Sequence, residues 1–542
     1  MSSNLEEAPG ESASVSGDLG RRRDTHVIFW GSTALMAVAA MIRNGYVFTQ
    51  KQYPISDAAL NTLLVDRAEH FQQLVGNYSR VRIHHPGPAL LYVLAAGQGL
   101  FHDALHLVPS QYNGQILAAI LYGAVFTALT MVTLYRLTGS RGATAVGLGV
   151  AFLFAATHHM LGDTWFPFLY MPAFLLFTLA GAAVAAGRTV EAPTFVLAAG
   201  VLAHGHVSFL LFVAVTTAVV AGSWWYVHRA GRRDELRRHR RGIIGAVGLI
   251  LLLALPIVIN TIVNYPGEWP GYLHYAEHAQ RAPRTAGQIA DFVGRYWAAI
   301  GVPVALLVVA AAVAILLTAT EPNRERRRIF VAIYGFVLLQ SALTFYYVAR
   351  GVDLLTRGNG YVGFFYMTVP LVLLIACAAQ LWVRAVDRFA RRLPRWAPAG
   401  AAALILVALA GRAATTGKLG LPHNPHAELP QLVAVLRSDP ARAGRMIEFD
   451  LDEHDVWPPV AGVAAESSRT GLPWCVAVPS GTPWAVLFDS SNSCKAGGPA
   501  RWQVHFSLRN PLPAGARVIG RLVENNATFT VFVRPGASST SP

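Results

Sequence analysis

Long apolar segments follow one another along most of the chain and are separated by short polar joints. They lie near 26–43, 86–102, 112–137, 143–161, 166–187, 192–204, 207–228, 242–262, 298–318, 329–349, 362–383 and 397–412. Apolar runs of about 17 to 25 residues are long enough to cross the hydrocarbon core of a bilayer as helices. The pattern therefore predicts a polytopic α-helical membrane protein.

Basic joints between these runs predict how the helices are oriented. Arginines cluster at 21–23, 229–241, 324–328 and 384–395, with weaker basic joints at Arg136, Arg141 and Arg188. Short loops rich in Arg or Lys face the cytoplasm. We therefore expect all of these joints on the cytoplasmic side.

The run at 86–102 decides how many helices span. If it crosses the membrane, the joints at Arg136, Arg141 and Arg188 fall outside, and 192–228 must count as one helix. If it lies at the interface, every basic joint falls inside. It is only about 25 Å long as a helix at 1.5 Å per residue, and it begins Pro-Gly-Pro. We favour the interfacial model, with about eleven spans, the N-terminus cytoplasmic and the C-terminus extracytoplasmic.

Composition narrows the class of protein further. The chain has 542 residues, of which 54% are hydrophobic and only 14% charged, whereas an average soluble protein is about 25% charged. The formal net charge is +14, but the arginines lie in short joints, as the positive-inside rule predicts. This placement excludes a nucleic-acid-binding face and indicates contact with membrane lipids of a plasma (inner) membrane.

Four regions follow from these patterns. Residues 1–25 are rich in Ser, Glu and Gly and are expected to form a disordered cytoplasmic tail. The transmembrane domain is 26–412, with 44–111 as its first external loop, which carries juxtamembrane helices. Residues 413–542 form an extracytoplasmic soluble domain.

The C-terminal region is predicted to be a small α/β domain. Helices are expected at 427–438 and 458–469, and strands at 446–451, 474–478, 485–488, 518–522 and 528–533, the last two as a hairpin. Cys475 and Cys494 lie in this region. They are expected to form a disulfide if it is exported and to stay unpaired thiols if it is cytoplasmic.

Asp57 is the leading candidate for chemistry. It lies in the polar segment after the first apolar run, at the predicted outer face. A carboxylate shielded there by lipid and loops can act as a general base. The alternative is that Ser56 or Asp57 caps a helix running through Leu64.

A basic group follows in the same loop. Arg80, Arg82, His84 and His85 precede Pro86-Gly87-Pro88, the start of the next apolar run. Arginine binds phosphate in a bidentate manner, and free amides at a helix N-terminus also attract anions. The group suggests a phosphate site at the membrane surface, and the alternative is a patch that binds lipid headgroups.

Further candidates lie in the other predicted outer loops. Asp163 could pair with Asp57, or simply cap a helix beside Trp165. His204 and His206 flank a tight turn, without acidic or cysteine partners spaced for a metal. Trp269 is suited to stacking on a sugar or to lying at the interface. Arg350 and Arg357 could reach a phosphate, or lie in a solvated turn.

This order of features resembles the GT-C superfamily of membrane glycosyltransferases, which includes protein O-mannosyltransferases and lipid A aminoarabinose transferases. Asp57 matches the acid of that family's first outer loop, and Asp163 matches the position of its second loop. His84-His85-Pro86-Gly87-Pro88 is similar to the family's helix-opening motif, with Gly in place of the second Pro. The similarity covers roughly residues 26–260.

The resemblance implies a polyprenyl-phosphate-linked sugar as donor and a glycan, lipid or protein as acceptor. Asp57 would be the general base of an inverting transfer, with Asp163 orienting the acceptor or the base. Arg80, Arg82, His84, His85, Arg350 and Arg357 would hold the donor phosphate, and Trp165, His204, His206 and Trp269 would contact the sugar or acceptor.

Many relatives carry paired acids where this chain has Ser56-Asp57. The lone acid suits metal-free base catalysis, so no metal ligands are assigned and a divalent cation remains open as a cofactor.

Two other classes compete with this interpretation. A polytopic transporter or flippase of a lipid-linked or envelope precursor would carry charges inside several helices, whereas the apolar runs here are nearly free of charge. An assembly or sensor protein with an exported binding domain would need far fewer spans.

Overall fold

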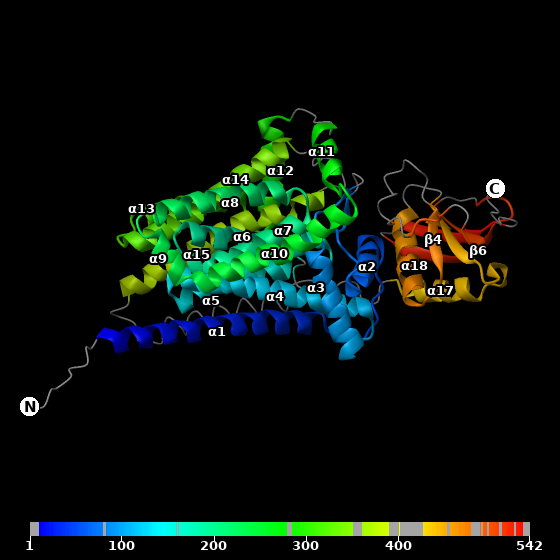
Figure 1. Ribbon diagram of the computed structural model, residues 1–542, viewed down its shortest axis with the longest axis horizontal. Coiled ribbons are helices and arrows are strands. Elements are labelled where there is room, and N and C mark those ends of the chain that lie inside the picture. Colours follow the sequence, from blue (N-terminus) through cyan, green and yellow to red (C-terminus); the bar gives the residue numbers. More distant parts are fainter. Residues whose placement is uncertain are drawn as a thin grey trace, which may run out of the picture.

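The computed structural model describes residues 10–79, 83–158, 160, 162–278, 284–350, 360–389, 400, 426–451, 456–477, 488, 492–495, 498–508, 512–524 and 527–534. A long helical bundle carries an α/β domain at one end (Figure 1). The polytopic helical architecture with a C-terminal α/β domain is therefore confirmed.

Seven helical segments in the described residues are long and apolar enough to cross a membrane. They are Arg22–Arg43 of α1 (Gly10–Arg43), α4 (Gln111–Thr138), α6 (Phe166–Ala185), α8 (Phe209–Val227), α10 (Arg240–Val263), α14 (Arg324–Arg350), and η4 (Gly360–Met367) continued by α15 (Thr368–Phe389). The helices α12 (Ala286–Ala299) and α13 (Val304–Ala319) would add an eighth as one span bent by 84°.

The predicted number of eleven spans is not confirmed. Two of the predicted runs form the shorter apolar helices α5 (Arg141–Thr157) and α7 (Ala192–Gly205), and the run at 397–412 lies outside the described residues. The run at 86–102 forms α3 (Ala89–Gly97) and the π-helical η2 (Gln98–Ala104).

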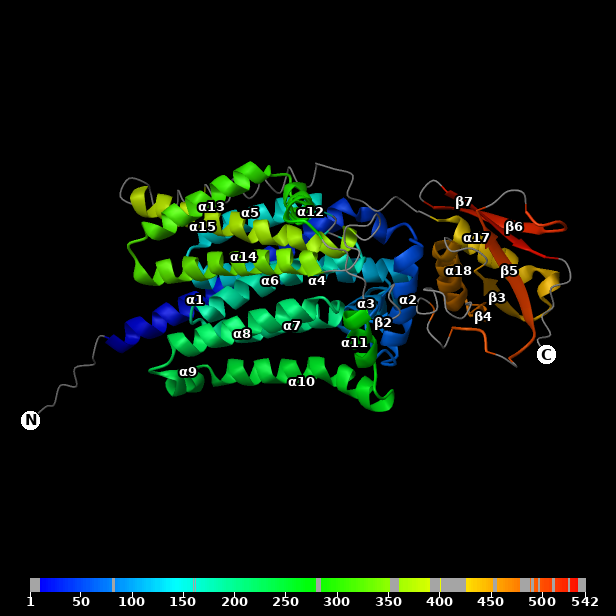
Figure 2. The ribbon, with the colours of Figure 1, turned by 90° about the horizontal axis from the view of Figure 1, so that it is seen from above.

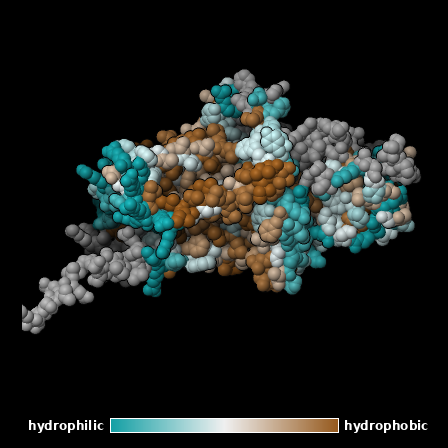
Figure 3. Space-filling view, in the orientation of Figure 1, coloured by the Kyte–Doolittle hydropathy of each residue, from teal (hydrophilic) through white to brown (hydrophobic). Residues whose placement is uncertain are grey.

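The bundle has a packed centre and an apolar outer surface. Within its apolar window α6 is 94% buried, whereas α10 is 6% buried. The outward side chains of α10 are largely apolar, including Leu251, Leu252 and Ile262. Figure 3 shows a broad hydrophobic band over the bundle with hydrophilic residues at both ends, as a membrane-spanning surface requires.

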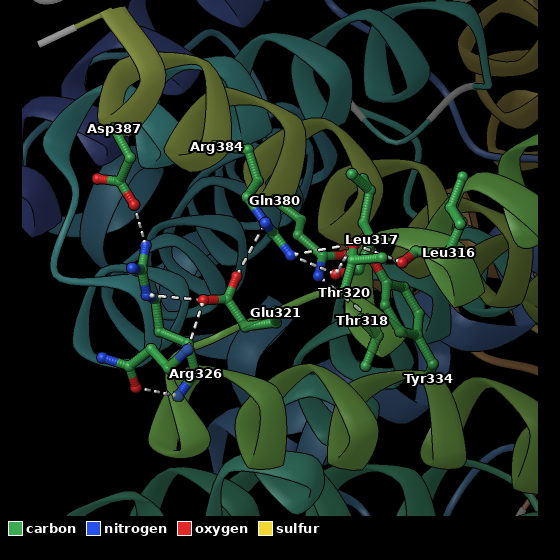
Figure 4. A network of polar contacts seen from close by, with 11 residues as sticks. Leu316, Leu317, Thr318, Thr320, Glu321, Arg326, Tyr334, Gln380, Arg384 and Asp387 are labelled. Carbon is green, nitrogen blue, oxygen red and sulfur yellow. Dashed lines mark hydrogen bonds and ion pairs between the residues drawn. The ribbon is translucent and has the colours of Figure 1, made fainter.

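One end of the bundle carries most of the arginines, and we call it the basic end. There Glu321, which is buried, lies 3.0 Å from Arg384 and 3.5 Å from Arg326. Arg326 also pairs with Asp387 at 2.5 Å (Figure 4). These contacts tie the turn between α13 and α14 to the end of α15.

Helix α1 begins earlier than the sequence indicates. We expected a disordered tail over residues 1–25, but the structure has a helix from Gly10, and residues 1–9 lie outside the described part of the chain.

The C-terminal domain contains a mixed sheet in the order β4-β3-β5-β7-β6. Its strands are β3 (Met446–Asp450), β4 (Trp474–Ala477), β5 (Arg501–Ser507), β6 (Arg517–Glu524) and β7 (Ala527–Val533). β3 pairs in parallel with β4 and β5, and β7 pairs antiparallel with β5 and β6. The helices are α17 (Glu428–Ser438) and α18 (Trp457–Arg469).

Most of these elements match the expected ones, including the hairpin of β6 and β7. Strand β5 was not predicted, and most of the strand expected at 485–488 lies outside the described residues. Cys475 and Cys494 are joined by a disulfide.

Helix α2 (Ser56–Glu69) connects the two halves of the molecule. Ala59, Leu60 and Leu63 are buried in the apolar core of the C-terminal domain, whereas Leu64 and Val65 are buried in the core of the bundle. Figures 1 and 2 show α2 between the bundle and α18. The segment between α1 and α4 and the C-terminal domain therefore share one core.

The remaining described elements are short. They are η1 (Gly45–Phe48), β1 (Tyr78–Ser79), β2 (Ile83–His84), η3 (Thr189–Glu191), α9 (Arg232–Arg238), α11 (Trp269–His278) and η5 (Pro440–Arg442).

We expect Leu60→Ala to destabilise the full chain by about 2–5 kcal/mol, because it leaves a cavity in the shared core. The thermal unfolding midpoint in detergent measures this. Val435→Ala is the control, because Val435 of α17 is 41% exposed. Equal midpoints for the two variants would contradict the shared core.

Candidate functional site

Asp57 lies in the first turn of α2 but does not cap it. Ile55 is the N-cap residue, and no side chain caps the helix. The two carboxylate oxygens instead accept hydrogen bonds from the Tyr78 hydroxyl and from Nε1 of Trp165, the latter at 2.9 Å. The capping interpretation of Ser56 and Asp57 is therefore wrong.

Ser56 contributes through its backbone. Its φ is +55°, in the left-handed region that non-glycine residues rarely adopt. Such strain costs on the order of 1 kcal/mol or more and tends to be found at functional sites. The left-handed residue turns the chain sharply just before Asp57, where the carboxylate meets Tyr78 and Trp165.

Trp165 joins this carboxylate to an aromatic surface. Its ring centroid lies 5.2 Å from that of Tyr361, 5.6 Å from Phe168 and 5.8 Å from Phe364. Aromatic faces beside a polar group suit the apolar faces of sugars as well as hydrocarbon chains.

Asp163 acts through Trp165. Its Oδ1 accepts a hydrogen bond from the backbone N–H of Trp165 at 2.8 Å, which holds that residue at the start of α6. Burial raises the pKa of Asp163 to about 6, against the effect of this hydrogen bond. Asp57, Trp165 and Asp163 are thus joined in one chain of hydrogen bonds.

The β1–β2 hairpin connects this site to the histidines of the same loop. Tyr78 and His84 are partners in its register. Glu268 accepts a hydrogen bond from the His84 backbone N–H at 3.0 Å, and its carboxylate lies 3.5 Å from Nδ1 of His84. The Tyr272 hydroxyl donates to the His84 carbonyl oxygen at 2.7 Å. The side chain of His84 therefore already has an anionic partner.

His85 and His206 face one another although they are far apart in sequence. Their ring centroids lie 4.0 Å apart, and Nδ1 of His85 accepts from the Val207 N–H at 3.4 Å. Burial lowers the pKa of His206 to about 4 and, with the neighbouring histidines, holds the pKa of His85 well below its usual value. Both rings are neutral at pH 7 and can offer hydrogen bonds but no charge.

His204 secures the start of α3. Its Nε2 lies 2.6 Å from the Leu253 carbonyl oxygen, and its Nδ1 accepts from the Ala89 N–H at 3.3 Å. Its carbonyl oxygen accepts from the Gly87 N–H at 3.1 Å. Both ring nitrogens have protein partners, as expected of a structural histidine.

The packing around Gly87 explains why the helix-opening motif has a glycine at this position. A β-carbon at this position would overlap Nδ1 of the His204 ring. The space that a side chain would fill is occupied by that ring.

The other predicted site residues are distributed as follows. Arg80, Arg82 and Arg357 lie outside the described residues. Arg350 is exposed at the end of α14. Nε1 of Trp269 donates to Thr261 at 3.2 Å, and its ring contacts Tyr272, so it lies on the Glu268 side of the hairpin.

Sequence reasoning missed two residues of the site. Tyr78 lies in the loop that was singled out, but nothing in the sequence indicates its bond to Asp57. Glu524, at the end of β6, is close enough to Asp57 for that carboxylate to influence it, and no sequence signal links the two positions.

One cluster of metal-ligand types occurs among the described residues, namely Glu448 with Cys475 and Cys494. The two cysteines are joined in the disulfide, so they offer no thiolate for a metal.

No protein-family model matches the chain, and no curated protein sequence matches it.

Solved structures do match. ArnT from Cupriavidus metallidurans bound to undecaprenyl phosphate is 14% identical with a TM-score of 0.51, over 94% of this chain and 98% of that chain. ArnT in the apo state is 13% identical with a TM-score of 0.49, over 92% and 97%. The first match confirms the fold expected from the GT-C resemblance along nearly the whole chain.

We expect Gly87→Ala to lower the stability of the full chain by about 1–3 kcal/mol, because the added methyl group overpacks the His204 ring. Thermal unfolding in detergent measures the effect, and Gly87→Ala combined with His204→Ala should recover part of it. A Gly87→Ala variant as stable as the parent would contradict this packing.

Proposed function

We propose that this protein is a membrane glycosyltransferase that moves a sugar from a polyprenyl-phosphate donor to an acceptor hydroxyl on the outer face of the membrane. The observation that carries the proposal is the carboxylate of Asp57, which is held by Tyr78 and Trp165 instead of capping its helix. The shared fold with ArnT, which was solved with undecaprenyl phosphate, supports the choice of donor.

Asp57 is the general base of this reaction. Each oxygen of its carboxylate keeps a further lone pair beyond its bond to Tyr78 or Trp165. The acceptor hydroxyl gives its proton to Asp57 while its oxygen bonds to the anomeric carbon. The bond from that carbon to the phosphate oxygen breaks, and the phosphate leaves with the electron pair. Attack opposite the leaving group inverts the anomeric centre.

Asp163 is a positioning residue in this scheme, since it holds Trp165 in place. The aromatic surface beside Trp165 receives the sugar or the first isoprene units. We keep His204, His206 and Trp269 as residues of the acceptor or sugar side, with His204 acting through its support of α3.

The donor phosphate requires cations, because its negative charge grows as the bond breaks. His85 is neutral and His84 is paired with Glu268. The positive charge therefore comes from arginine, with Arg80, Arg82, Arg350 and Arg357 as the candidates, and His85 adds a hydrogen bond. A divalent cation as cofactor stays open.

We expect Asp57→Asn to lower sugar transfer by about 10²–10⁴-fold, because an amide cannot accept the proton. Transfer is measured with the full chain in nanodiscs, undecaprenyl-phosphate-linked sugars as donors and native membranes as acceptor source. Asp291→Asn is the matched control, because its side chain is 70% exposed.

Undecaprenyl phosphate should bind Asp57→Asn as it binds the parent. Transfer at the parental rate by a folded Asp57→Asn protein would overturn the role of Asp57. Lipid translocation that survives this substitution would favour the transporter.

The proposed orientation puts the basic end in the cytoplasm and the C-terminal domain outside. We expect a membrane-impermeant thiol reagent to label Leu107→Cys in intact cells and to label Arg233→Cys only after lysis. Both positions are exposed. The reverse labelling pattern would invert the topology.

A further inference from the structure

A groove runs along the outside of the bundle between α8 and α14. Both helices pack against α6, and Figures 1 and 2 show them alongside it. The groove has a volume of about 540 Å³. Much of its lining consists of small residues, namely Ala185, Ala186, Ser223, Ala332, Gly335 and Ala342. A β-carbon added at Gly335 would meet nothing within 4 Å, so this part of the groove is open space.

Polar contacts fix the two helices near both ends of the groove. Toward the middle of the bundle, Nε2 of Gln340 on α14 donates to Oγ1 of Thr216 on α8 at 2.9 Å. At the basic end, residues 188–189 after α6 bind both helices. The first pairs with Glu325 of α14 at 2.6 Å, and the second accepts a hydrogen bond from Nε1 of Trp224 of α8 at 2.9 Å. The groove is therefore built into the packing of the bundle.

The lining of the groove suits a hydrocarbon chain. Ser223 and Arg328 are the only polar residues that line it, and Val219, Val331 and Leu338 are exposed at its opening. Lipid chains are as apolar as these side chains. At 1.5 Å per residue the stretch from Arg328 to Ala342 is about 21 Å long, whereas one leaflet contributes roughly 15 Å to the hydrocarbon core. An acyl chain of one leaflet can therefore lie along it.

Arg328 places a positive charge at one end of this groove. It lies on the same face of α14 as Val331 and Gly335, because residues three, four and seven positions apart share one face of a helix. Arg328 is exposed and has no ion pair in the described part of the chain, whereas the nearby Arg326 pairs with Asp387. An arginine at the membrane surface without an acidic partner attracts lipid phosphate.

We propose that this groove binds one phospholipid with an anionic headgroup, its acyl chain along α14 and its phosphate on Arg328. The surrounding arginines of the basic end favour a lipid with net negative charge over a zwitterionic one. In the orientation proposed above, the lipid belongs to the cytoplasmic leaflet. The site lies at the other end of the bundle from α2, which carries Asp57, so the inference does not depend on glycosyl transfer (Figure 1).

Two substitutions in the full chain test the two halves of this site, and each has a matched control. Arg328→Gln removes the charge, and Arg327→Gln removes an equal charge from the next residue, which is exposed but does not line the groove. Gly335→Leu fills the groove. Gly245→Leu adds the same side chain to α10, where a β-carbon also meets nothing within 4 Å.

Binding is measured by native mass spectrometry in detergent, with phosphatidylglycerol, phosphatidylcholine and undecaprenyl phosphate added separately. We expect the parent to bind phosphatidylglycerol more tightly than phosphatidylcholine. Arg328→Gln should weaken the binding of phosphatidylglycerol by about 5-fold, since one arginine near the membrane surface contributes about that factor. Gly335→Leu should weaken the binding of both phospholipids. Undecaprenyl phosphate binding should be unchanged in both variants.

The controls Arg327→Gln and Gly245→Leu should bind all three lipids as the parent does. The thermal unfolding midpoint without added lipid should match the parent in every variant, because the changed side chains are exposed. Equal binding of the two phospholipids by the parent, or parental phosphatidylglycerol binding by Arg328→Gln, would overturn the inference. Loss of undecaprenyl phosphate binding instead of phosphatidylglycerol binding would also overturn it, since the groove would then hold the polyprenyl lipid.

Discussion

The two-sided burial of α2 is the contact on which the arrangement of this protein depends. A helix of fourteen residues buries one face in the membrane bundle and the other in the C-terminal domain. Both cores include its side chains, since Ala59, Leu60 and Leu63 are buried in one and Leu64 and Val65 in the other. The first residue of its first turn, Ser56, is strained and the next is Asp57, so the position of the carboxylate is determined by packing on both sides.

In the described part of the chain, the hydrogen-bond donors to the Asp57 carboxylate are neutral groups. These donors are the phenol of Tyr78 and the indole of Trp165, and His85 and His206 are buried and neutral. A salt bridge would hold a carboxylate ionised and would also lower its ability to accept a proton. Neutral donors orient the carboxylate without adding a charge beside it. In the proposed reaction, positive charge is needed instead at the phosphate of the donor.

Much of the fold could be predicted from the sequence, since it follows from local patterns. The apolar runs predicted most of the long helices. In the C-terminal domain, apolar segments separated by turn residues predicted α17, α18, β3 and the β6–β7 hairpin. Asp57 and Trp165 were both singled out, yet the bond between them was not, because no periodicity relates a loop residue to the start of α6. For the same reason the sequence does not indicate the places of Tyr78 and Glu524 or the stacking of His85 on His206. The number of spans could not be predicted either, since α5 and α7 are short. The prediction that Ser56 or Asp57 caps α2 was wrong, because the Asp57 side chain makes tertiary contacts instead.

The contact between Gly87 and His204 constrains how this sequence can change over evolutionary time. The ring of one residue occupies the volume that a side chain at the other would need. A larger residue at position 87 is accessible only if position 204 first becomes smaller, and the intermediate then loses the bonds of the His204 ring to the Ala89 N–H and the Leu253 carbonyl oxygen. The two positions are therefore expected to change together during evolution. The residue type at position 87 of the helix-opening motif can be interpreted only together with His204 of α7.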